Sequence, residues 1–206
     1  MEFNIIETQE KLKAFLPVNR YLHSLGVQYT AANLAMKYEY DIKKAEIAGL
    51  LHDCAKCIPD DEMLSECIKN HIPVTPIEEK CKFLLHAKLG AFYAKNEYHI
   101  SDESIIDAIT YHTTGKPEMT TLEKIIYIAD YIEPSRKIIP GLSQIRKVAY
   151  DDLNQATYLI LGHTINYIQK DCQKEMDPMS EQAFEYYKNL NHYKKENVNE
   201  YSKNND

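Results

Sequence analysis

Hydrophobic residues recur every three or four positions along most of the chain, and no stretch shows the strict apolar–polar alternation of a half-buried strand. This spacing places apolar side chains on one face of a helix, so it predicts an all-α protein. Capping residues and prolines divide the pattern into segments. We expect about ten helices, at residues 8–16, 17–38, 41–57, 59–70, 75–98, 101–114, 120–133, 141–149 and 151–171 and from residue 180 onward.

The length and composition fit a single domain. With 206 residues, of which 44% are hydrophobic, the chain can bury one sizeable core. Residues 1–192 carry the helical pattern and form the predicted domain. Residues 193–206 are polar and charged with almost no aliphatic side chains, so we expect a disordered tail there.

The charge and the cysteines narrow the class of protein. A net charge of −7 argues against a nucleic-acid backbone as the main partner, although a local basic pocket is compatible with it. No apolar run approaches about 18 residues and the N-terminus lacks signal-peptide features, so we expect no membrane partner and a cytoplasmic location. The five cysteines lack framework spacing, which fits a reducing compartment. Cys54 and Cys57 form a C-x-x-C pair without a strand–helix context, and we interpret it as incidental.

The segment "GLLHDCAK" at residues 49–56 places His52 and Asp53 in a run that otherwise has the composition of a buried helix. Burying an unpaired carboxylate costs several kcal/mol or forces the group to take up a proton. Three further histidines and one aspartate have similar apolar flanks on predicted helices: His23, His86, His112 and Asp130. One such histidine is usually a hydrogen-bonded core residue, but six such side chains in one small domain favour convergence on a cation.

These six side chains offer imidazole and carboxylate groups without a thiolate. Such a donor set suits iron, manganese, cobalt or zinc in a reactive site better than a structural zinc cage. Six ligands exceed one tetrahedral site, so they fit either one octahedral ion with open positions or two ions bridged by one carboxylate. An open position holds water, and a divalent ion makes that water a nucleophile near neutral pH, so the pattern indicates a hydrolase.

Several cationic residues near these candidates can contact phosphate. Lys56 lies about one helical turn after Asp53, where it either neutralises a polyphosphate or is a solvated helix-end lysine. The planar guanidinium of Arg136 suits bidentate phosphate contact, with an ion pair to Glu133 as the alternative. Arg20 lies one turn before the first candidate histidine, and it either orients the site or pairs with an acid.

The other polar residues are assigned from their local context. Thr113, Thr114 and Gly115 follow His112 at a helix end, where they either face a phosphate oxygen or cap the chain reversal. Three histidines are not expected at the site: His71 and His99 lie in polar, loop-like segments, and His163 fits the core.

The order of the six candidates along the chain, H…HD…H…H…D, resembles that of the HD-domain metal-dependent phosphohydrolases. Four segments extend the resemblance to the YqeK family: "RYLHSLGV", "AGLLHDCAK", "HTTGKPEMTTLEKIIYIADYIEPSR" and "PGLSQIRKVA". Together they span residues 20 to about 150, and the long third segment is the most specific. One departure is visible, because the family often has a histidine before a proline near its C-terminus, where this chain has "MDPMS" at 176–180.

The resemblance implies an all-helical HD fold, bound iron as one or two ions, and symmetrical hydrolysis of diadenosine tetraphosphate (Ap4A) to two ADP. Manganese, cobalt, zinc or magnesium are alternatives to iron. Carried over by position, the resemblance implies three sets of residues. The main metal would be held by His23, His52, Asp53 and Asp130. A second ion or the phosphates would be held by His86 and His112, and the nucleotide would also contact Lys56, Thr113 and Arg136. The catalytic residues would be Asp53, His86 and His112.

The expected partners are therefore the nucleotide substrate and its ADP product, without nucleic acid or membrane, and a homodimer is one option. Two other functions stay open. One is an HD phosphohydrolase of another nucleotide, such as a dNTP or a cyclic dinucleotide, and the other is a non-catalytic metal- and nucleotide-binding sensor. All six candidate positions are filled here, whereas a degenerate sensor site usually lacks one or more ligands.

Overall fold

The computed structural model describes residues 3–169 and 175–203, with side chains up to residue 191. These residues form eleven α-helices and one 3-10 helix without a strand, which confirms the predicted all-α fold. The helices are α1 (Ile5–Phe15), α2 (Val18–Lys37), α3 (Ile42–Leu51), α4 (Asp60–Lys69), α5 (Pro76–Lys80), η1 (Lys82–Leu84), α6 (Leu85–Asn96), α7 (Glu103–Tyr111), α8 (Thr121–Ile132), α9 (Leu142–Val148), α10 (Leu153–Tyr167) and α11 (Pro178–Lys203).

Helix starts follow from side-chain caps. At the start of α8, Thr120 Oγ1 accepts the Glu123 N–H at 3.3 Å, and Glu123 Oε2 accepts the Thr120 N–H at 2.6 Å. This reciprocal pair satisfies two backbone donors that the first turn leaves open. Asp41 caps α3 through a single bond, in which its Oδ1 accepts the Lys44 N–H. Helix α1 starts earlier than predicted because Asn4 supplies its cap.

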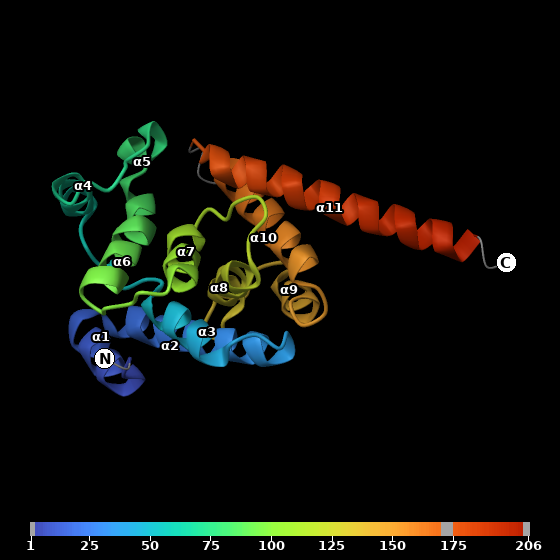
Figure 1. Ribbon diagram of the computed structural model, residues 1–206. Coiled ribbons are helices and arrows are strands. Elements are labelled where there is room, and N and C mark those ends of the chain that lie inside the picture. Colours follow the sequence, from blue (N-terminus) through green and yellow to red (C-terminus); the bar gives the residue numbers. More distant parts are fainter. Residues whose placement is uncertain (1–2, 170–174, 204–206) are drawn as a thin grey trace.

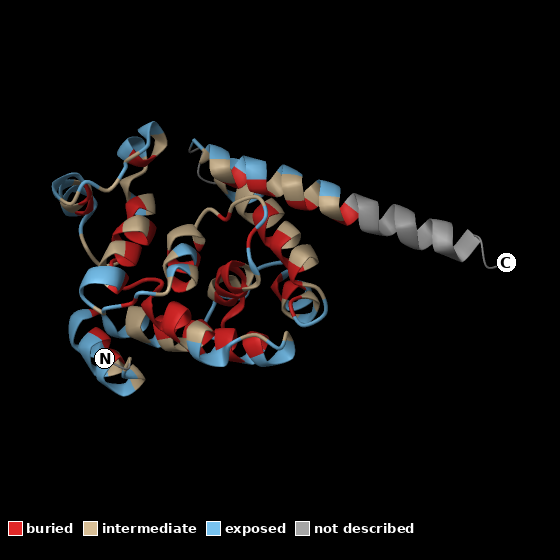
Figure 2. Ribbon diagram, in the orientation of Figure 1, coloured by how far each residue is buried: buried red, intermediate tan, exposed pale blue. Residues whose placement is uncertain are grey.

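Helix α8 runs through the middle of the molecule and packs against α2, α3, α7 and α10 (Figure 1). Figure 2 shows buried residues concentrated where these helices face one another. Five apolar residues of α8 are fully buried: Leu122, Ile125, Ile126, Ile128 and Ala129. Because α8 is enclosed on several sides, a polar side chain near its end, such as Asp130, is held in a fixed position.

A smaller cluster lies at the end of the molecule formed by α4, α5 and α6 (Figure 1). Met63 and Cys67 of α4 pack there against Leu85 and Leu89 of α6. The predicted helix over 75–98 is wrong in one respect, because it is divided into α5, η1 and α6. Helix α6 is the last of these three segments. One of its faces packs in this cluster, and its His86 side chain is buried toward the main core.

The prediction that a helix continues over 41–57 is wrong at its C-terminal end. Helix α3 stops at Leu51, and tight turns follow, in which the Cys54 N–H donates to the Leu51 carbonyl and the Lys56 N–H to the Asp53 carbonyl. The His52 side chain bonds to the carbonyl of Gly49 at 2.7 Å. The His52 side chain therefore bonds to a carbonyl group that the end of the helix leaves without a backbone partner, and the chain turns at His52 and Asp53.

The predictions for the C-terminal end of the chain are not tested by the structure. Helix α11 runs through Lys203, but the side chains of residues 192–203 and all of 204–206 lie outside the described part, so the domain boundary at 192 and the disordered tail stay predictions. Within the described residues no helix has the length and apolarity needed to cross a bilayer.

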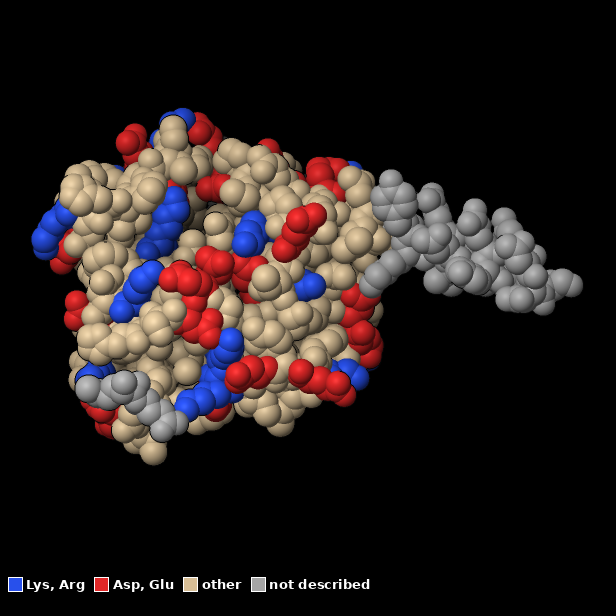
Figure 3. Space-filling view, viewed as in Figure 1, with Lys and Arg blue, Asp and Glu red and all other residues tan. Residues whose placement is uncertain are grey.

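Figure 3 shows Lys and Arg side chains mixed with Asp and Glu over one face, which is hollowed near its middle.

Candidate metal centre

Six polar side chains from five parts of the fold meet at the centre of the bundle. His23 comes from α2, His52 and Asp53 from the end of α3, His86 from α6, His112 from the end of α7 and Asp130 from α8. Five of the six residues are buried, and the Asp130 side chain keeps 23% of its surface exposed. The sequence prediction that these six residues converge agrees with this geometry.

The two oxygens of Asp53 face different histidine pairs. Asp53 Oδ2 lies 3.8 Å from His23 Nε2 and 3.5 Å from His52 Nε2. Asp53 Oδ1 lies 3.3 Å from His86 Nε2 and 3.5 Å from His112 Nε2. A carboxylate placed between two imidazole pairs has the arrangement that a bridge between two ions requires, and it also suits one ion held on the Oδ2 side.

Asp130 completes the first of these two groups. Its Oδ1 lies 3.0 Å from His23 Nε2 and 3.8 Å from His52 Nε2. His23, His52 and Asp130 therefore present three ligand atoms within 4.8 Å of one another, and His52, Asp53 and His112 do the same. Both sets match the separations of atoms that share one coordination sphere.

Each imidazole has its second nitrogen occupied by a protein acceptor. His52 Nδ1 bonds to the Gly49 carbonyl, His112 Nδ1 to the Ile109 carbonyl and His86 Nδ1 to the Phe83 carbonyl, always three residues earlier in the chain. His23 Nδ1 bonds instead to a carboxylate oxygen at 3.0 Å. An acceptor at Nδ1 places the proton there and leaves Nε2 with a lone pair, so all four Nε2 atoms face the centre as potential ligands.

The residues fit a bound cation. His23 Nε2 and His52 Nε2 are buried and have no hydrogen-bonding partner among the described residues. Buried nitrogens without a partner are rare because each costs about 1–3 kcal/mol. A divalent ion would satisfy both nitrogens, and a donor set of imidazole and carboxylate without thiolate suits iron, manganese, cobalt or zinc.

The pKa values of His86, Asp53 and Asp130 favour the forms that bind metal. For His23, burial alone would lower the pKa, but its contacts with Asp130 and Glu133 raise it. Burial lowers the pKa of His86 to about 4, so its ring is neutral near pH 7. Burial alone would raise the pKa of Asp53, but the neighbouring His52, His112 and His86 side chains hold it well below its usual range. For Asp130, burial is likewise outweighed by the close approach of His23 and by the positive charge of Arg136, which lower its pKa.

Two arginines bind the carboxylates from outside. Arg20 Nη1 lies 2.5 Å from Asp53 Oδ2, so its partner acid is itself part of the centre. Arg136 donates from Nη2 to Asp130 Oδ1 at 2.5 Å and from Nε to the Asp130 carbonyl at 2.8 Å. The alternative ion pair between Arg136 and Glu133 is not formed, because Glu133 has other partners.

Lys56 and Thr113 lie on the opposite side, beside the second histidine pair. Lys56 Nζ is 3.2 Å from His86 Nδ1, and burial lowers the pKa of this lysine. Thr113 Oγ1 is 3.2 Å from His86 Nε2 and 3.1 Å from His112 Nε2. A solvated helix-end lysine would not be enclosed in this way, so the geometry favours the interpretation of Lys56 as a group of the site.

The segment 176–180 that departs from the family pattern also lies near this side. Ser180 Oγ donates to the Thr114 carbonyl at 3.0 Å, and Asp177 and Met179 line a narrow hollow with Thr113 and Thr114. This chain therefore presents a carboxylate where the family often has a histidine.

Glu133 is the site residue that the sequence reasoning missed. It is buried, and its Oε1 lies 3.0 Å from His23 Nδ1. Ser135 donates its N–H to Glu133 Oε2 at 2.6 Å and its hydroxyl to Oε1 at 2.7 Å. Gly26 makes room for the carboxylate, because a Cβ at this position would lie 2.6 Å from Glu133 Oε2. Glu133 thus orients His23, a candidate ligand. The sequence signal that could have indicated this role is the position of Glu133 three residues after Asp130, about one helical turn along the chain.

The remaining histidines lie outside the centre, and no described cysteine belongs to either group of candidate ligand atoms. His71 and His99 are exposed, as predicted. His163 is only half-buried, so its assignment to the core is wrong. Its ring lies over Gly141 and near the Tyr131 hydroxyl at 3.4 Å. The four described cysteines are all free, whereas Cys172 and the side chain of His192 lie outside the described part.

Comparisons with known proteins agree with this geometry. The family model named HD domain matches residues 20–135. The symmetrical bis(5'-nucleosyl)-tetraphosphatase of Bacillus subtilis is 43% identical over 162 residues, which cover 79% of this chain and 86% of that protein. The protein of the same name from Staphylococcus aureus is 40% identical over 82% of this chain and 87% of its own length. The crystal structure of a predicted HD superfamily hydrolase involved in NAD metabolism, from Clostridium acetobutylicum, matches with a TM-score of 0.88 and 38% identity, covering 92% of this chain and all of that one.

Proposed function

The chain belongs to the HD-domain family, in the group that contains the symmetrical bis(5'-nucleosyl)-tetraphosphatases, and we propose that it hydrolyses Ap4A to two molecules of ADP. The family assignment by sequence resemblance is thereby confirmed. The protein is a metal-dependent phosphohydrolase with Ap4A as its substrate. The observation that carries this proposal is the pair of carboxylates, Asp53 buried and Asp130 half-buried, each held between inward-facing histidine nitrogens and an arginine.

The proposed metal ligands are His23, His52, Asp53 and Asp130, with His86 and His112 for a second ion or for the phosphates. We propose iron as the natural metal, with manganese, cobalt, zinc or magnesium as substitutes, because this donor set does not by itself select one ion. When bound, the metal supplies Lewis-acid activation of water and of a phosphoryl oxygen.

The protein's own cations are arranged for an anionic substrate. Arg20 and Arg136 hold the ligand carboxylates in place, and a guanidinium carries five N–H donors, so each keeps further donors for phosphate oxygens. Lys56 adds a positive charge beside His86 on the other side. Charge that develops on the departing ADP is stabilised by these fixed cations, which need no rearrangement during the reaction.

Symmetrical cleavage requires water to attack one of the two inner phosphorus atoms. The new bond joins that phosphorus to the water oxygen, and the bond that breaks joins the same phosphorus to the oxygen between the two halves. Asp53 and the paired His86 and His112 lie at the meeting point of the cations, so we propose that the attacked phosphorus lies over them. Each product is then an ADP.

Three further parts of the proposal concern the protein's surroundings. ADP is the proposed product and inhibitor, and a homodimer remains compatible with the fold. Neither nucleic acid nor membrane is expected to bind, since the net charge is −7 and basic side chains are mixed with acidic ones on the face in Figure 3. A cytoplasmic location is proposed because the described cysteines are free, as in a reducing compartment.

Turnover of Ap4A by protein purified without chelator tests the proposal. We expect ADP as the product in the presence of Fe²⁺ or Mn²⁺, and loss of activity after chelation that either ion restores. Binding of Ap4A without turnover under all metal conditions would favour the sensor, and hydrolysis of dNTPs or cyclic dinucleotides in preference to Ap4A would favour the other phosphohydrolase function.

A further inference from the structure

A hollow of about 650 Å³ opens beside the metal centre, on the side of His23 and the two arginines. Its walls come from the first turns of α2, the last turn of α8, the loop 133–141 and the start of α9. The volume lies in the range of small-molecule sites, about 300–1,000 Å³. Lys56, Thr113, His86 and His112 lie on the other side of Asp53 and do not line this hollow.

The hollow combines cations with an apolar wall. Arg20, Arg136 and Lys137 line it, and the two arginines reach from the hollow to the ligand carboxylates at 2.5 Å. Lys137 is exposed and no interaction holds it among the described residues. Glu133 also lines the hollow, and the two arginines are paired with Asp53 and Asp130. The remaining guanidinium N–H groups and the Lys137 ammonium still offer several donors to one cavity, which favours an anion with more than one phosphate.

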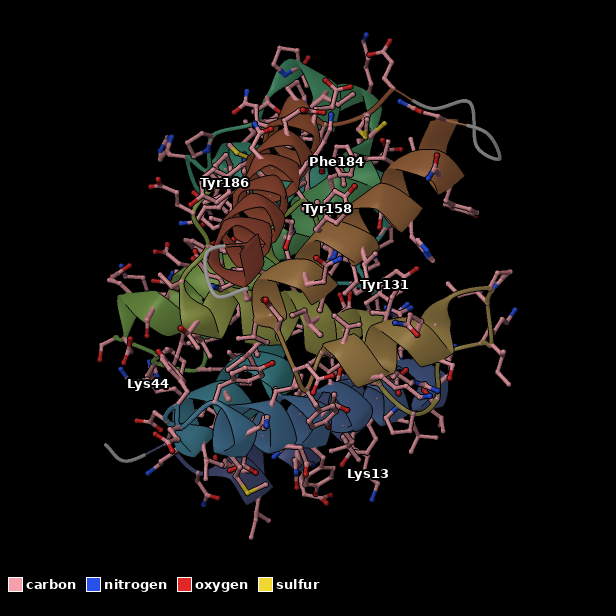
Figure 4. The ribbon with its side chains drawn as sticks, turned by 90° about the vertical axis from the view of Figure 1, so that its right-hand side faces the viewer. Lys13, Lys44, Tyr131, Tyr158, Phe184 and Tyr186 are labelled. Atoms are coloured by element: carbon pink, nitrogen blue, oxygen red, sulfur yellow. The ribbon has the colours of Figure 1, made fainter. Side chains whose placement is uncertain are left out.

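The apolar wall offers a surface for a nucleobase and ribose. It is formed by Tyr131, Leu142 and Ile139. Tyr131 (Figure 4) is half-buried in the last turn of α8, with its hydroxyl 3.4 Å from His163 Nδ1, and Ile139 is 41% exposed at the rim. An aromatic ring held by a polar tip beside aliphatic side chains is a common platform for a flat base.

We propose that this hollow binds the second nucleoside diphosphate half of the substrate. The inference rests on the proposed function, and it places the first half on the side of Lys56 and Thr113, beside His86. Each half then has its own cations, and Asp53 lies between them with one oxygen toward each side. Cleavage in the middle of the tetraphosphate follows from this arrangement, because two phosphates extend from the centre into each side.

Two neighbouring isoleucines provide a matched test. Ile139 lines the hollow, whereas Ile138 is 93% exposed and does not line it, and both lie in the same loop. A glutamate at either position adds the same charge to the surface, so Ile139→Glu repels a bound nucleotide and Ile138→Glu controls for charge and folding. The matched substitutions leave all six candidate metal ligands unchanged.

The experiment measures ADP bound to metal-loaded protein by equilibrium dialysis up to millimolar ADP, together with Ap4A kinetics. We expect two ADP per chain for the wild type and Ile138→Glu and one for Ile139→Glu, whose KM for Ap4A should rise about tenfold or more. One ADP per wild-type chain, or two in Ile139→Glu, would overturn the second site.

The same data separate this inference from the proposed function. Normal Ap4A turnover with a single ADP site refutes the second site and leaves the proposed function in place. Two ADP sites, one of them lost in Ile139→Glu, without any Ap4A turnover would keep the nucleotide site and refute the proposed function.

Discussion

Replacing Glu133 with glutamine should weaken metal binding although Glu133 is not a predicted ligand. Glu133 Oε1 lies 3.0 Å from His23 Nδ1, and both carboxylate oxygens accept hydrogen bonds from Ser135. A glutamine has the same shape but only one oxygen. If its amide nitrogen takes the Oε2 position, it faces the Ser135 N–H, and if it takes the Oε1 position, it faces the proton on His23 Nδ1. Either orientation places the amide N–H group opposite another hydrogen-bond donor.

The size of the effect follows from the role of such partners. Loss of a carboxylate that orients a metal-binding histidine typically lowers metal affinity about 10–100-fold, or about 1.4–2.8 kcal/mol. The lower end applies if the His23 ring keeps its position, and the upper end applies if it rotates. Because Glu133 is buried beside His23, water cannot replace the lost acceptor without a rearrangement.

The assay is titration of metal-free protein with Mn²⁺ or Fe²⁺ against a competing chelator, with thermal unfolding of the metal-free protein measured in parallel. Glu123→Gln is the matched control, since Glu123 is equally buried at the other end of α8 and bonds to Thr120 and Lys116. We expect this control to lose about 1 kcal/mol of stability and to keep its metal affinity. Wild-type metal affinity in Glu133→Gln would refute the assigned role of Glu133.

Three other variants test separate parts of the account. Asp53→Ala should lose both bound metal and turnover in metal analysis and an Ap4A assay, and stoichiometric metal with normal turnover would show that the centre is misassigned. Arg136→Lys should lower kcat/KM about tenfold with metal content unchanged, since an ammonium cannot replace a bidentate fork, and loss of metal would mean a structural role. Hydrogen bonds from Lys44 and Ser104 lower the pKa of Asp102 to about 2, so its stabilisation is present above the unfolded pKa of about 3.9 and disappears as the pH falls toward 2. Asp102→Ala should therefore cost about 1 kcal/mol in urea unfolding at pH 7 and less at pH 3, and an equal cost at both pH values would contradict this assignment.

The sequence predicts the helices and the site residues where local signals are strong. The capping box of Thr120 and Glu123 marks the start of α8 because its hydrogen bonds are local. The six candidate ligands are found because each is a polar group among apolar neighbours, and a buried carboxylate such as Asp53 needs polar or cationic partners. The matching order of these residues in a known family then supplies the reaction.

Features that depend on long-range contacts are not predictable in this way. The partner of Arg20 lies 33 residues away and that of His23, Glu133, lies 110 residues away, so neither pairing leaves a local pattern. The end of α3 at Leu51 was missed because helical spacing continues through the turn, whereas the His52 side chain takes the carbonyl that the next turn would need. The half-buried state of His163 likewise depends on the loop around Gly141.

Hydrolysis of Ap4A in oxygen-18 water tests the central claim most directly, because it reports both the products and the phosphorus that water attacks. Mass spectrometry should find ADP as the sole nucleotide product, with one of the two ADP molecules from each substrate carrying one oxygen-18 atom in its terminal phosphate. AMP and ATP as products, with the label in either of them, would contradict symmetrical cleavage at a centre placed between two nucleotide halves.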